Sequence, residues 1–226
     1  MVIDADTKEP ITGASVYLNR TTIGGVTDIS GKYELNTTTI LYTQLIISCI
    51  GYEKVVVEKP FEFLPDTIFL KEKSILMDEV SVSVKAKSVF SEKKKMQAFR
   101  EQLFGVTFPQ RSCRILNEKD VRLLYDPEAN KLHGYANVPL KIENYYLGYD
   151  ILFELIEFTI EFKEKKSLNP ENVGSVSIIG FASFKEKSKL TPQIKNLRLK
   201  IYNVSKNRFF KSLAQKEIGQ KNQYIL

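Results

Sequence analysis

Residues 45–58 read LIISCIGYEKVVVE, two apolar runs separated by a single glycine. The first run, residues 45–50, is almost continuously apolar, which is typical of a β-strand covered on both faces. Gly51 ends this run, and the three valines that follow Tyr52 predict a second strand directly after it. We therefore expect a β-sheet in this part of the chain, with little room for helices.

Shorter runs with period-two alternation flank this stretch at residues 14–18, 32–35 and 66–70. Residues 27–31, TDISG, separate two of these runs; Asp28 can accept backbone N–H bonds there and Gly31 can adopt a positive φ. The spacing predicts an all-β sandwich of about seven strands over residues 1–73. The structural turn residues of this sandwich are expected to be Thr27, Asp28, Gly31, Gly51 and Tyr52.

The pattern changes after residue 73. Residues 79–84 alternate as one further strand, and residues 85–95 are rich in lysine, so residues 74–95 are expected to form a strand and a linker. Met96, Phe99 and Leu103 then follow helical spacing, and Gly105 supplies a stop signal, which predicts a helix from Glu92 to Phe104.

Residues 96–226 are expected to form an α+β domain. Strands are predicted at residues 121–125, 132–136, 149–162 and 175–184, with a turn at residues 126–130 between the first two. Residues 191–215 predict one or two helices, with Ser205 as an N-cap. Glu154, Glu157 and Glu161 occupy odd and even positions of the long strand and are interpreted as its solvated edge; the alternative is acid–base chemistry by a pair of these carboxylates.

Charge is divided unevenly along the 226 residues. Residues 1–84 hold 7 Lys/Arg against 12 Asp/Glu, whereas residues 85–226 hold 26 Lys/Arg against 15 Asp/Glu. Such asymmetry is typical of two segments with different surfaces or partners. No run of about 18 apolar residues is present, so no membrane-spanning helix is expected. No basic and apolar leader precedes the first strand-like residues, so we expect any export signal to be absent from this sequence.

The residue types needed for catalysis are sparse. His133 is the single histidine, which excludes a multi-histidine zinc site. It is expected to be a partly exposed strand residue rather than a catalytic base. Cys49 is expected to be buried; Cys113 lies beside two arginines, where a thiolate is the alternative to a structural role. The turn carboxylate of Asp28 alone cannot supply the roughly six to eight oxygens that calcium requires. We expect no enzyme activity, no metal and no cofactor.

Residues 2–7, 10–16, 24–35 and 45–52 together resemble the carboxypeptidase-regulatory-like (transthyretin-like) domain of cell-envelope proteins in Bacteroidetes-type bacteria. The motifs that carry the resemblance are the TDxxG hairpin and the terminal Ile50-Gly51-Tyr52. The resemblance implies a prealbumin-like Greek-key sandwich that is not catalytic. It also implies a place in the periplasm or at the outer membrane.

Further resemblances extend into the rest of the chain. Residues 77–82 are similar to the segment that follows this domain in TonB-dependent outer-membrane receptors, although neither a plug nor a barrel follows here. Residues 99–105, 113–117, 139–144, 147–149 and 208–213 look like the second domain of stand-alone envelope proteins of such bacteria. The implied function is an envelope interaction protein that contacts a protein or a glycan. The alternative is an accessory or regulatory extension related to nutrient receptors.

The basic second half leaves two further partners to consider. Arginines next to aromatic residues suit nucleic acid, but the lysines are interspersed with glutamates as on an ordinary surface, which weighs against it. Anionic lipid head groups or envelope polysaccharide are favoured instead. The candidates for a contact surface are Tyr145, Tyr146 and Tyr149, together with Arg208 and Phe209; the alternative favoured for the three tyrosines is a core or strand-end role.

Overall fold

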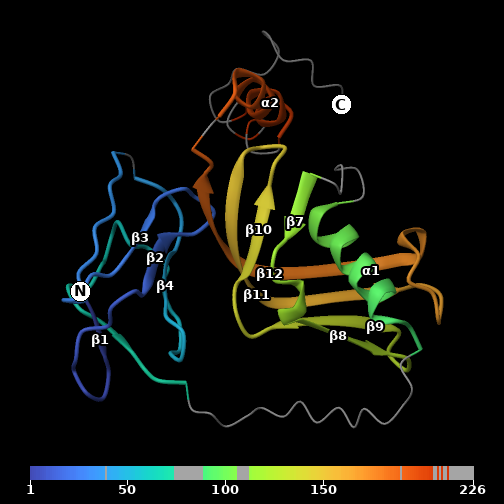
Figure 1. Ribbon diagram of the computed structural model, residues 1–226, viewed down its shortest axis with the longest axis horizontal. Helices are drawn as coiled ribbons and strands as arrows, with labels where there is room; N and C mark the ends of the chain where they lie inside the picture. Colours follow the sequence, from blue (N-terminus) through green and yellow to red (C-terminus); the bar gives the residue numbers. More distant parts are fainter. Residues whose placement is uncertain are drawn as a thin grey trace.

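The computed structural model describes residues 1–38, 40–73, 89–105, 112–188 and 190–205, together with Arg208, Phe210 and Leu213. Twelve strands and two α-helices lie within these residues. Figure 1 shows residues 1–73 as a small β-module on the left, and a larger bent sheet with helix α1 on the right. The expected order, a β-sandwich followed by an α+β region, is confirmed.

The N-terminal module is built on β4 (Leu45–Ser48), the strand that the continuous apolar run predicts. Strand β4 pairs with β2 (Ser15–Leu18) and β5 (Val55–Val57), and β3 (Gly24–Val26) completes an antiparallel sheet of four strands. The second sheet of the sandwich pairs β1 (Val2–Asp4) in parallel with β6 (Ile68–Leu70). The buried residues between them are Val2, Ile11, Ala14, Val16, Leu18, Leu45, Ile47, Ile68 and Leu70.

The predicted strand at residues 32–35 is wrong. The described part of residues 1–73 contains six strands, and none lies at residues 32–35. The backbone of Lys32 is used by the preceding turn instead: its carbonyl accepts from Asp28 N at 2.8 Å, and its amide donates to Asp28 Oδ1 at 3.0 Å. Those bonds divert the chain out of a ladder, although it still passes close to β3 at Gly25.

Helix α1 spans Glu92–Phe104, the predicted bounds. Ser91 caps it by accepting from Lys94 N, and Gly105 ends it with φ of 82°. The helix includes Lys95, which the sequence had suggested as part of the linker. Lys95 is buried, and its ammonium group is satisfied there: Nζ donates to Leu123 O at 2.7 Å and pairs with Glu92 at 2.6 Å. The predicted strand at residues 79–84, and the linker as far as residue 88, lie outside the described residues.

The large sheet is organised around β11 (Tyr149–Phe162). One edge of β11 pairs with β10 (Leu140–Asn144) near its start and with β9 (Lys131–Ala136) near its end. Strands β7 (Cys113–Ile115) and β8 (Val121–Asp126) lie outside these two, and β12 (Val173–Glu186) follows the other edge of β11. The predicted hairpin at residues 121–136 and the long strand are confirmed. Short 3-10 helices lie at Glu118–Asp120 and Pro170–Asn172.

The sheet bends around α1, so that β7 and β10 diverge from β8 and β9 in Figure 1. Irregular pairing of β11 with β12 between Leu155 and Glu157 marks the bend. A bulge of this kind lets a long strand change the face that each side chain occupies. Phe99 of α1 packs on Phe158 of β11, with ring centroids 4.5 Å apart, at the centre of the second core.

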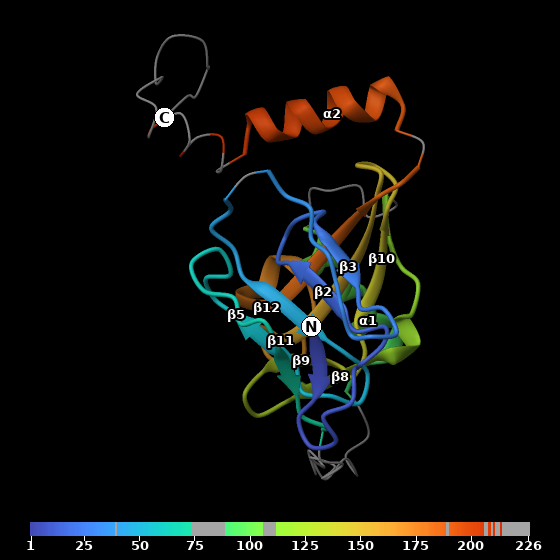
Figure 2. The ribbon, with the colours of Figure 1, turned by 90° about the vertical axis from the view of Figure 1, so that its left-hand side faces the viewer.

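Helix α2 (Pro192–Asn203) lies at the outer end of the bent sheet, and Figure 2 shows it across the top of the molecule. Thr191 caps it by accepting from Ile194 N. Ser205 follows, and its Oγ accepts from Arg208 N at 3.2 Å, as the predicted second N-cap requires. Arg208, Phe210 and Leu213 are helical, and Phe209 lies outside the described residues.

Candidate contact surfaces

The turn that follows β3 is fixed from its buried side by Thr27. The Thr27 hydroxyl accepts from Ala14 N at 2.9 Å and donates to Ile11 O at 2.6 Å, with the side chain almost fully buried. Gly31 has φ of +70°, and a Cβ there would lie 2.4 Å from the carbonyl oxygen of Val2. Both residues therefore serve the packing of the turn against the N-terminal strand.

Asp28 faces solvent on the other side of this turn. Its Oδ1 accepts from Ser30 Oγ at 2.7 Å, Ser30 N at 2.8 Å and Lys32 N at 3.0 Å. These bonds, above all the one from the Ser30 hydroxyl, lower the pKa of Asp28 because they favour the charged carboxylate. The three hydrogen bonds of Asp28 Oδ1 are thus all made within its own turn.

Gly51 and Tyr52 shape the bend after β4. Gly51 has φ of +88°, and Tyr52 Oη donates to Asp4 Oδ2 at 2.9 Å. The other carboxylate oxygen of Asp4 accepts the backbone amides of Asp6 and Thr7. The bond to Asp4 is the main reason that the pKa of Tyr52 rises to about 12. These contacts join β1 to the bend at Gly51 and Tyr52, the two residues that end the motif of the resemblance.

The face of the four-stranded sheet that carries Tyr17 and Ile46 docks on the second domain. Tyr17 and Ile46 are cross-strand partners, and both are buried. Tyr17 Oη donates to Glu154 Oε1 of β11 at 2.9 Å, and Lys54 Nζ pairs with Glu154 Oε2 at 2.5 Å. Lys54 also lies 5.1 Å above the ring of Phe181 in β12. This Tyr17–Glu154–Lys54 cluster joins the two domains.

The interpretation of the strand glutamates as one solvated edge is wrong for Glu154. Only 9% of Glu154 is exposed, while Glu157 and Glu161 are exposed as predicted. The difference follows from the docked N-terminal module, which supplies Tyr17 and Lys54 as partners for the carboxylate. Burial of a charged group requires such partners.

Backbone bonds reinforce this junction at the outer edge of β12. Arg20 N donates to Ala182 O at 2.7 Å, and Phe184 N donates to Thr21 O at 2.9 Å. Thr21 and Ser183 form a parallel bridge. Residues of the N-terminal module therefore extend the large sheet by one short segment.

The predicted tyrosine surface lies at the turn between β10 and β11. Tyr145 is half exposed; its hydroxyl bonds to Glu143 Oε2, and Lys187 Nζ lies 5.1 Å from its ring centroid. This hydrogen bond raises the pKa of Tyr145 and lowers the pKa of Glu143. Tyr146 is half-buried. Tyr145 is the residue of this group that presents most surface.

Tyr149 is covered by α2. Arg198 stacks on its ring with the guanidinium carbon 3.8 Å from the centroid. The rings of Tyr149 and Phe184 form a T-shaped pair with centroids 5.7 Å apart. The Arg198 guanidinium also donates to the carbonyls of Leu147 at 2.7 Å and Gly148 at 3.1 Å. Tyr149 thus anchors α2 rather than offering a free contact. Arg208 lies in the next helical stretch and is half-buried, whereas an exposed contact residue was predicted.

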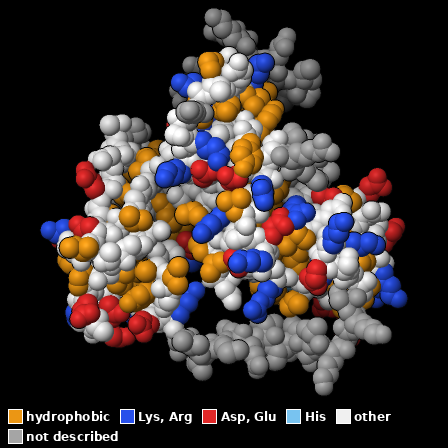
Figure 3. All heavy atoms as spheres, in the orientation of Figure 1, with side chains coloured by type: hydrophobic (Ala, Val, Ile, Leu, Met, Phe, Trp, Pro, Cys, Tyr) orange, Lys and Arg blue, Asp and Glu red, His pale blue; other side chains and the backbone are white. Residues whose placement is uncertain are grey.

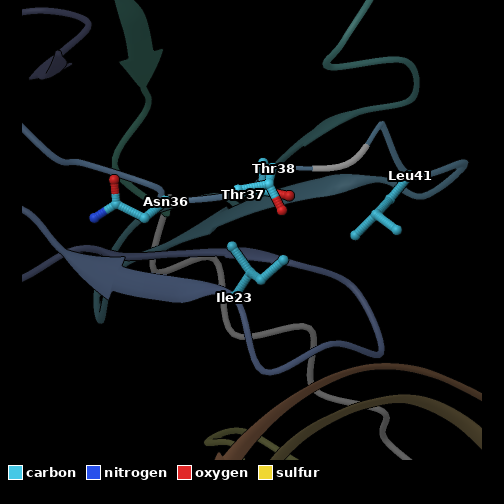
Figure 4. Close-up of a pocket in the computed structure, with 5 residues that line it drawn as sticks. All are labelled: Ile23, Asn36, Thr37, Thr38 and Leu41. Carbon is cyan, nitrogen blue, oxygen red and sulfur yellow. The ribbon is translucent and has the colours of Figure 1, made fainter.

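A hollow of about 440 Å³ lies where residue 23, just before β3, meets the segment leading to β4. Figure 4 shows Ile23 pointing toward Thr37 and Thr38, with Leu41 at one end and Asn36 at the other. These five described residues supply methyl, hydroxyl and amide groups and no ionisable side chain. Such a lining suits contact with a polar ligand or chain segment better than acid–base chemistry.

The two sequence neighbours of Leu41, which lines the hollow, carry large exposed side chains. Tyr42 is fully exposed and Ile40 is 70% exposed. Neither exposed side chain was predicted from the sequence. The available signal was the run of three apolar residues, Ile40-Leu41-Tyr42, within the polar segment 36–43, where no strand alternation explains it.

The nucleophile and base candidates lie apart from this hollow. His133 Nδ1 lies 3.2 Å from Thr159 Oγ1 on the large sheet, a contact that orients the ring without a carboxylate. Burial raises the pKa of both Cys49 and Cys113, which disfavours the thiolate considered for Cys113. No three His, Cys, Asp or Glu side chains gather as a metal site within the described residues. No described helix is long and apolar enough to cross a lipid bilayer.

Comparison with known families identifies one region. Residues 1–82 match the family model of the CarboxypepD_reg-like domain. The match includes the whole N-terminal module and continues past residue 73, where the sequence analysis had ended it. No curated protein matches the chain.

Proposed function

We propose that this chain is a non-catalytic interaction protein of the cell envelope. Its N-terminal module contacts a protein or a glycan through the surface formed by the hollow, Ile40 and Tyr42. The observation that carries this proposal is the fully exposed Tyr42, which directly follows Leu41 in the chain. Leu41 lines the hollow together with Ile23, Asn36, Thr37 and Thr38. Exposed aromatic and aliphatic side chains next to hydroxyl and amide groups are typical of recognition surfaces.

The docking of the module supports a presenting role. The Tyr17 face of its sheet is fixed to β11 and β12, so the loops at its ends remain available for contact. Loops held by a rigid sandwich are a common location of binding residues. A fixed module loses less conformational entropy on binding than a tethered one.

The envelope location is taken from the resemblance of residues 2–52 to domains of envelope proteins, and residues 1–82 match the CarboxypepD_reg-like domain. Periplasmic or outer-membrane association is therefore part of the proposal. A contact role also fits the lining of the hollow, which offers no group for proton transfer among its described residues.

A sedimentation assay tests the contact surface. The full chain is mixed with envelope fragments from the organism that produces it, and the bound fraction is measured for the wild type and for Ile40→Ser/Tyr42→Ser. Ile29→Ser is the matched control, because Ile29 is 86% exposed on the same module and does not line the hollow. We expect the double variant alone to lose binding.

Treatment of the fragments identifies the partner class. Proteinase digestion abolishes binding to a protein, and periodate oxidation abolishes binding to a glycan. Equal binding of the wild type and the double variant contradicts the proposal. Recovery of the native full-length protein only from the cytoplasm contradicts the envelope location.

A further inference from the structure

Helix α2 carries more apolar side chains than its contacts cover. Five of its twelve residues are large and hydrophobic, namely Ile194, Leu197, Leu199, Ile201 and Tyr202, yet no residue of the helix is buried. A helix of this length is only marginally stable in isolation and depends on packing of an amphipathic face. The helix therefore has a partly satisfied inner face and a second apolar surface.

The inner face is held by the turn between β10 and β11. Ile194, Leu197, Arg198 and Ile201 follow i, i+3, i+4, i+7 spacing and are all half-buried. Arg198 makes the polar contacts, and Gly148 permits the close approach of the helix. This face accounts for the position of α2 but leaves the opposite side uncovered.

Two large apolar side chains of α2 lie outside this inner face and are exposed, and they define the outer face of the helix. Leu199 is 58% exposed and Tyr202 is 42% exposed, and they are neighbours at i, i+3 spacing. Val204, at the end of the helix, is 79% exposed. The next helical stretch adds Phe210 and Leu213, both at least half exposed. Figure 3 shows hydrophobic side chains beside Lys and Arg side chains at this end of the molecule.

Positive charge prevails in the sequence of this region. Residues 191–226 contain eight Lys/Arg against the single acidic residue Glu217. Lys195 lies one turn before Leu199 on the same face, and Lys200 lies on the adjoining side; both are exposed. Long lysine side chains can keep their ammonium groups among anionic head groups while their stems lie along apolar surface.

We propose that the outer face of α2 and the helical residues after it dock on an anionic phospholipid bilayer. Transfer of aliphatic side chains from water to the acyl boundary of a bilayer is favourable in free energy, whereas nucleic acid offers these side chains no comparable apolar environment. The net positive charge is complementary to anionic head groups. Figures 1 and 2 show α2 as the outermost described helix, so a flat surface can reach it. The proposal does not depend on the contact role of the N-terminal module.

The absence of tryptophan from the sequence allows a specific test. Tyr202→Trp introduces the single tryptophan of the full chain at the outer face of α2. We expect its fluorescence to shift to the blue with phosphatidylglycerol-containing vesicles and not with phosphatidylcholine vesicles. Tyr42→Trp is the control at another exposed tyrosine, whose emission stays unchanged with both.

Vesicle sedimentation of further variants separates the apolar and the electrostatic contributions. Leu199→Glu is expected to weaken binding by about tenfold or more, because it removes apolar burial and adds repulsion. Lys195→Gln/Lys200→Gln is expected to weaken binding most at low salt. Ile29→Glu and Lys32→Gln/Lys59→Gln are the matched controls at exposed residues of the N-terminal module.

Three results would overturn the proposal. The first is an unshifted Tyr202→Trp spectrum with anionic vesicles. The second is binding that Leu199→Glu leaves unchanged. The third is binding of duplex DNA at the same salt with greater affinity than vesicles and equal sensitivity to Lys195→Gln/Lys200→Gln. Loss of envelope binding by Ile40→Ser/Tyr42→Ser bears only on the other surface, so failure of one proposal is distinguishable from failure of the other.

Discussion

Tyr17 and Glu154, 137 positions apart in the sequence, share a buried hydrogen bond of 2.9 Å between the tyrosine hydroxyl and the carboxylate. Burial and the neighbouring carboxylate raise the pKa of Tyr17, so the hydroxyl remains a donor throughout the neutral range. Lys54 completes the cluster from the same module as Tyr17. The contact joins the N-terminal module to β11 through buried groups.

Removal of the Tyr17 hydroxyl is expected to weaken that contact. Tyr17→Phe loses a hydrogen bond to a charged acceptor, which is worth about 1.5–3 kcal/mol. The free energy of unfolding, measured by urea denaturation, should fall by that amount. Tyr42→Phe, at a fully exposed residue, is the control and should change stability by less than about 0.5 kcal/mol. Equal stability of Tyr17→Phe and the wild type would show that the domains are not coupled here.

Gly31 and Gly13 form a matched pair for testing close packing of the turn. Both have positive φ, +70° and +78°, but a Cβ at Gly31 would meet Val2 O at 2.4 Å while a Cβ at Gly13 has no atom within 4 Å. Gly13→Ala should cost about 1–2 kcal/mol from backbone strain alone. Gly31→Ala should cost more than about 3 kcal/mol, because backbone must move. Similar melting temperatures for the two variants would contradict the clash.

Asp28 is expected to contribute a pH-dependent part of stability. Its folded pKa lies below the unfolded value, so its contribution is present above about pH 4 and is lost as pH falls through the folded pKa. Asp28→Asn should therefore be less stable than the wild type at pH 7, and the difference should shrink at acidic pH. Denaturation curves between neutral and acidic pH measure this, with Glu9→Gln as an exposed control. A difference that stays constant with pH would contradict the assignment.

Arg198 is expected to fix α2 without supporting the core. Arg198→Lys loses the stacking on Tyr149 and the paired bonds to the carbonyls of Leu147 and Gly148. Hydrogen exchange should become faster across α2, while the urea midpoint of the whole chain changes little. Lys200→Gln, on the exposed side of the same helix, should leave the exchange of α2 unchanged. Protection of α2 that survives Arg198→Lys would assign its anchoring to the apolar contacts alone.

Local signals predicted the elements whose bounds depend on neighbours in sequence. Gly105 ends α1 and was identified as a stop signal in the sequence, and the helical spacing of Met96, Phe99 and Leu103 predicted the helix itself. The apolar length of β11 and the Asp-Pro turn before β9 were equally readable. The continuous apolar run of β4 correctly predicted burial on both faces.

Features that depend on distant segments were missed for physical reasons. Glu154 resembles its exposed neighbours in the sequence, and only the docking of Tyr17 and Lys54 makes it buried. In the sequence Lys95 resembles the other lysines of the linker, and only the folded structure shows that its ammonium group donates to the carbonyl of Leu123.

The candidate site was missed for the same kind of reason. Tyr149 belongs to an aromatic cluster in the sequence, but Arg198 covers it from a later helix. Tyr42 attracted no attention because its exposure is set by the course of the segment around it rather than by any motif.

The bonds from Arg20 and Thr21 to β12 also determine how the chain can be divided. A fragment that starts at residue 89 would expose the carbonyl of Ala182 and the amide of Phe184 on an open strand edge, which recruits other copies. Such a fragment should self-associate when expressed alone. Co-expression with residues 1–73 should restore a one-to-one complex, so the two halves would act as a split protein whose reassembly reports on the junction.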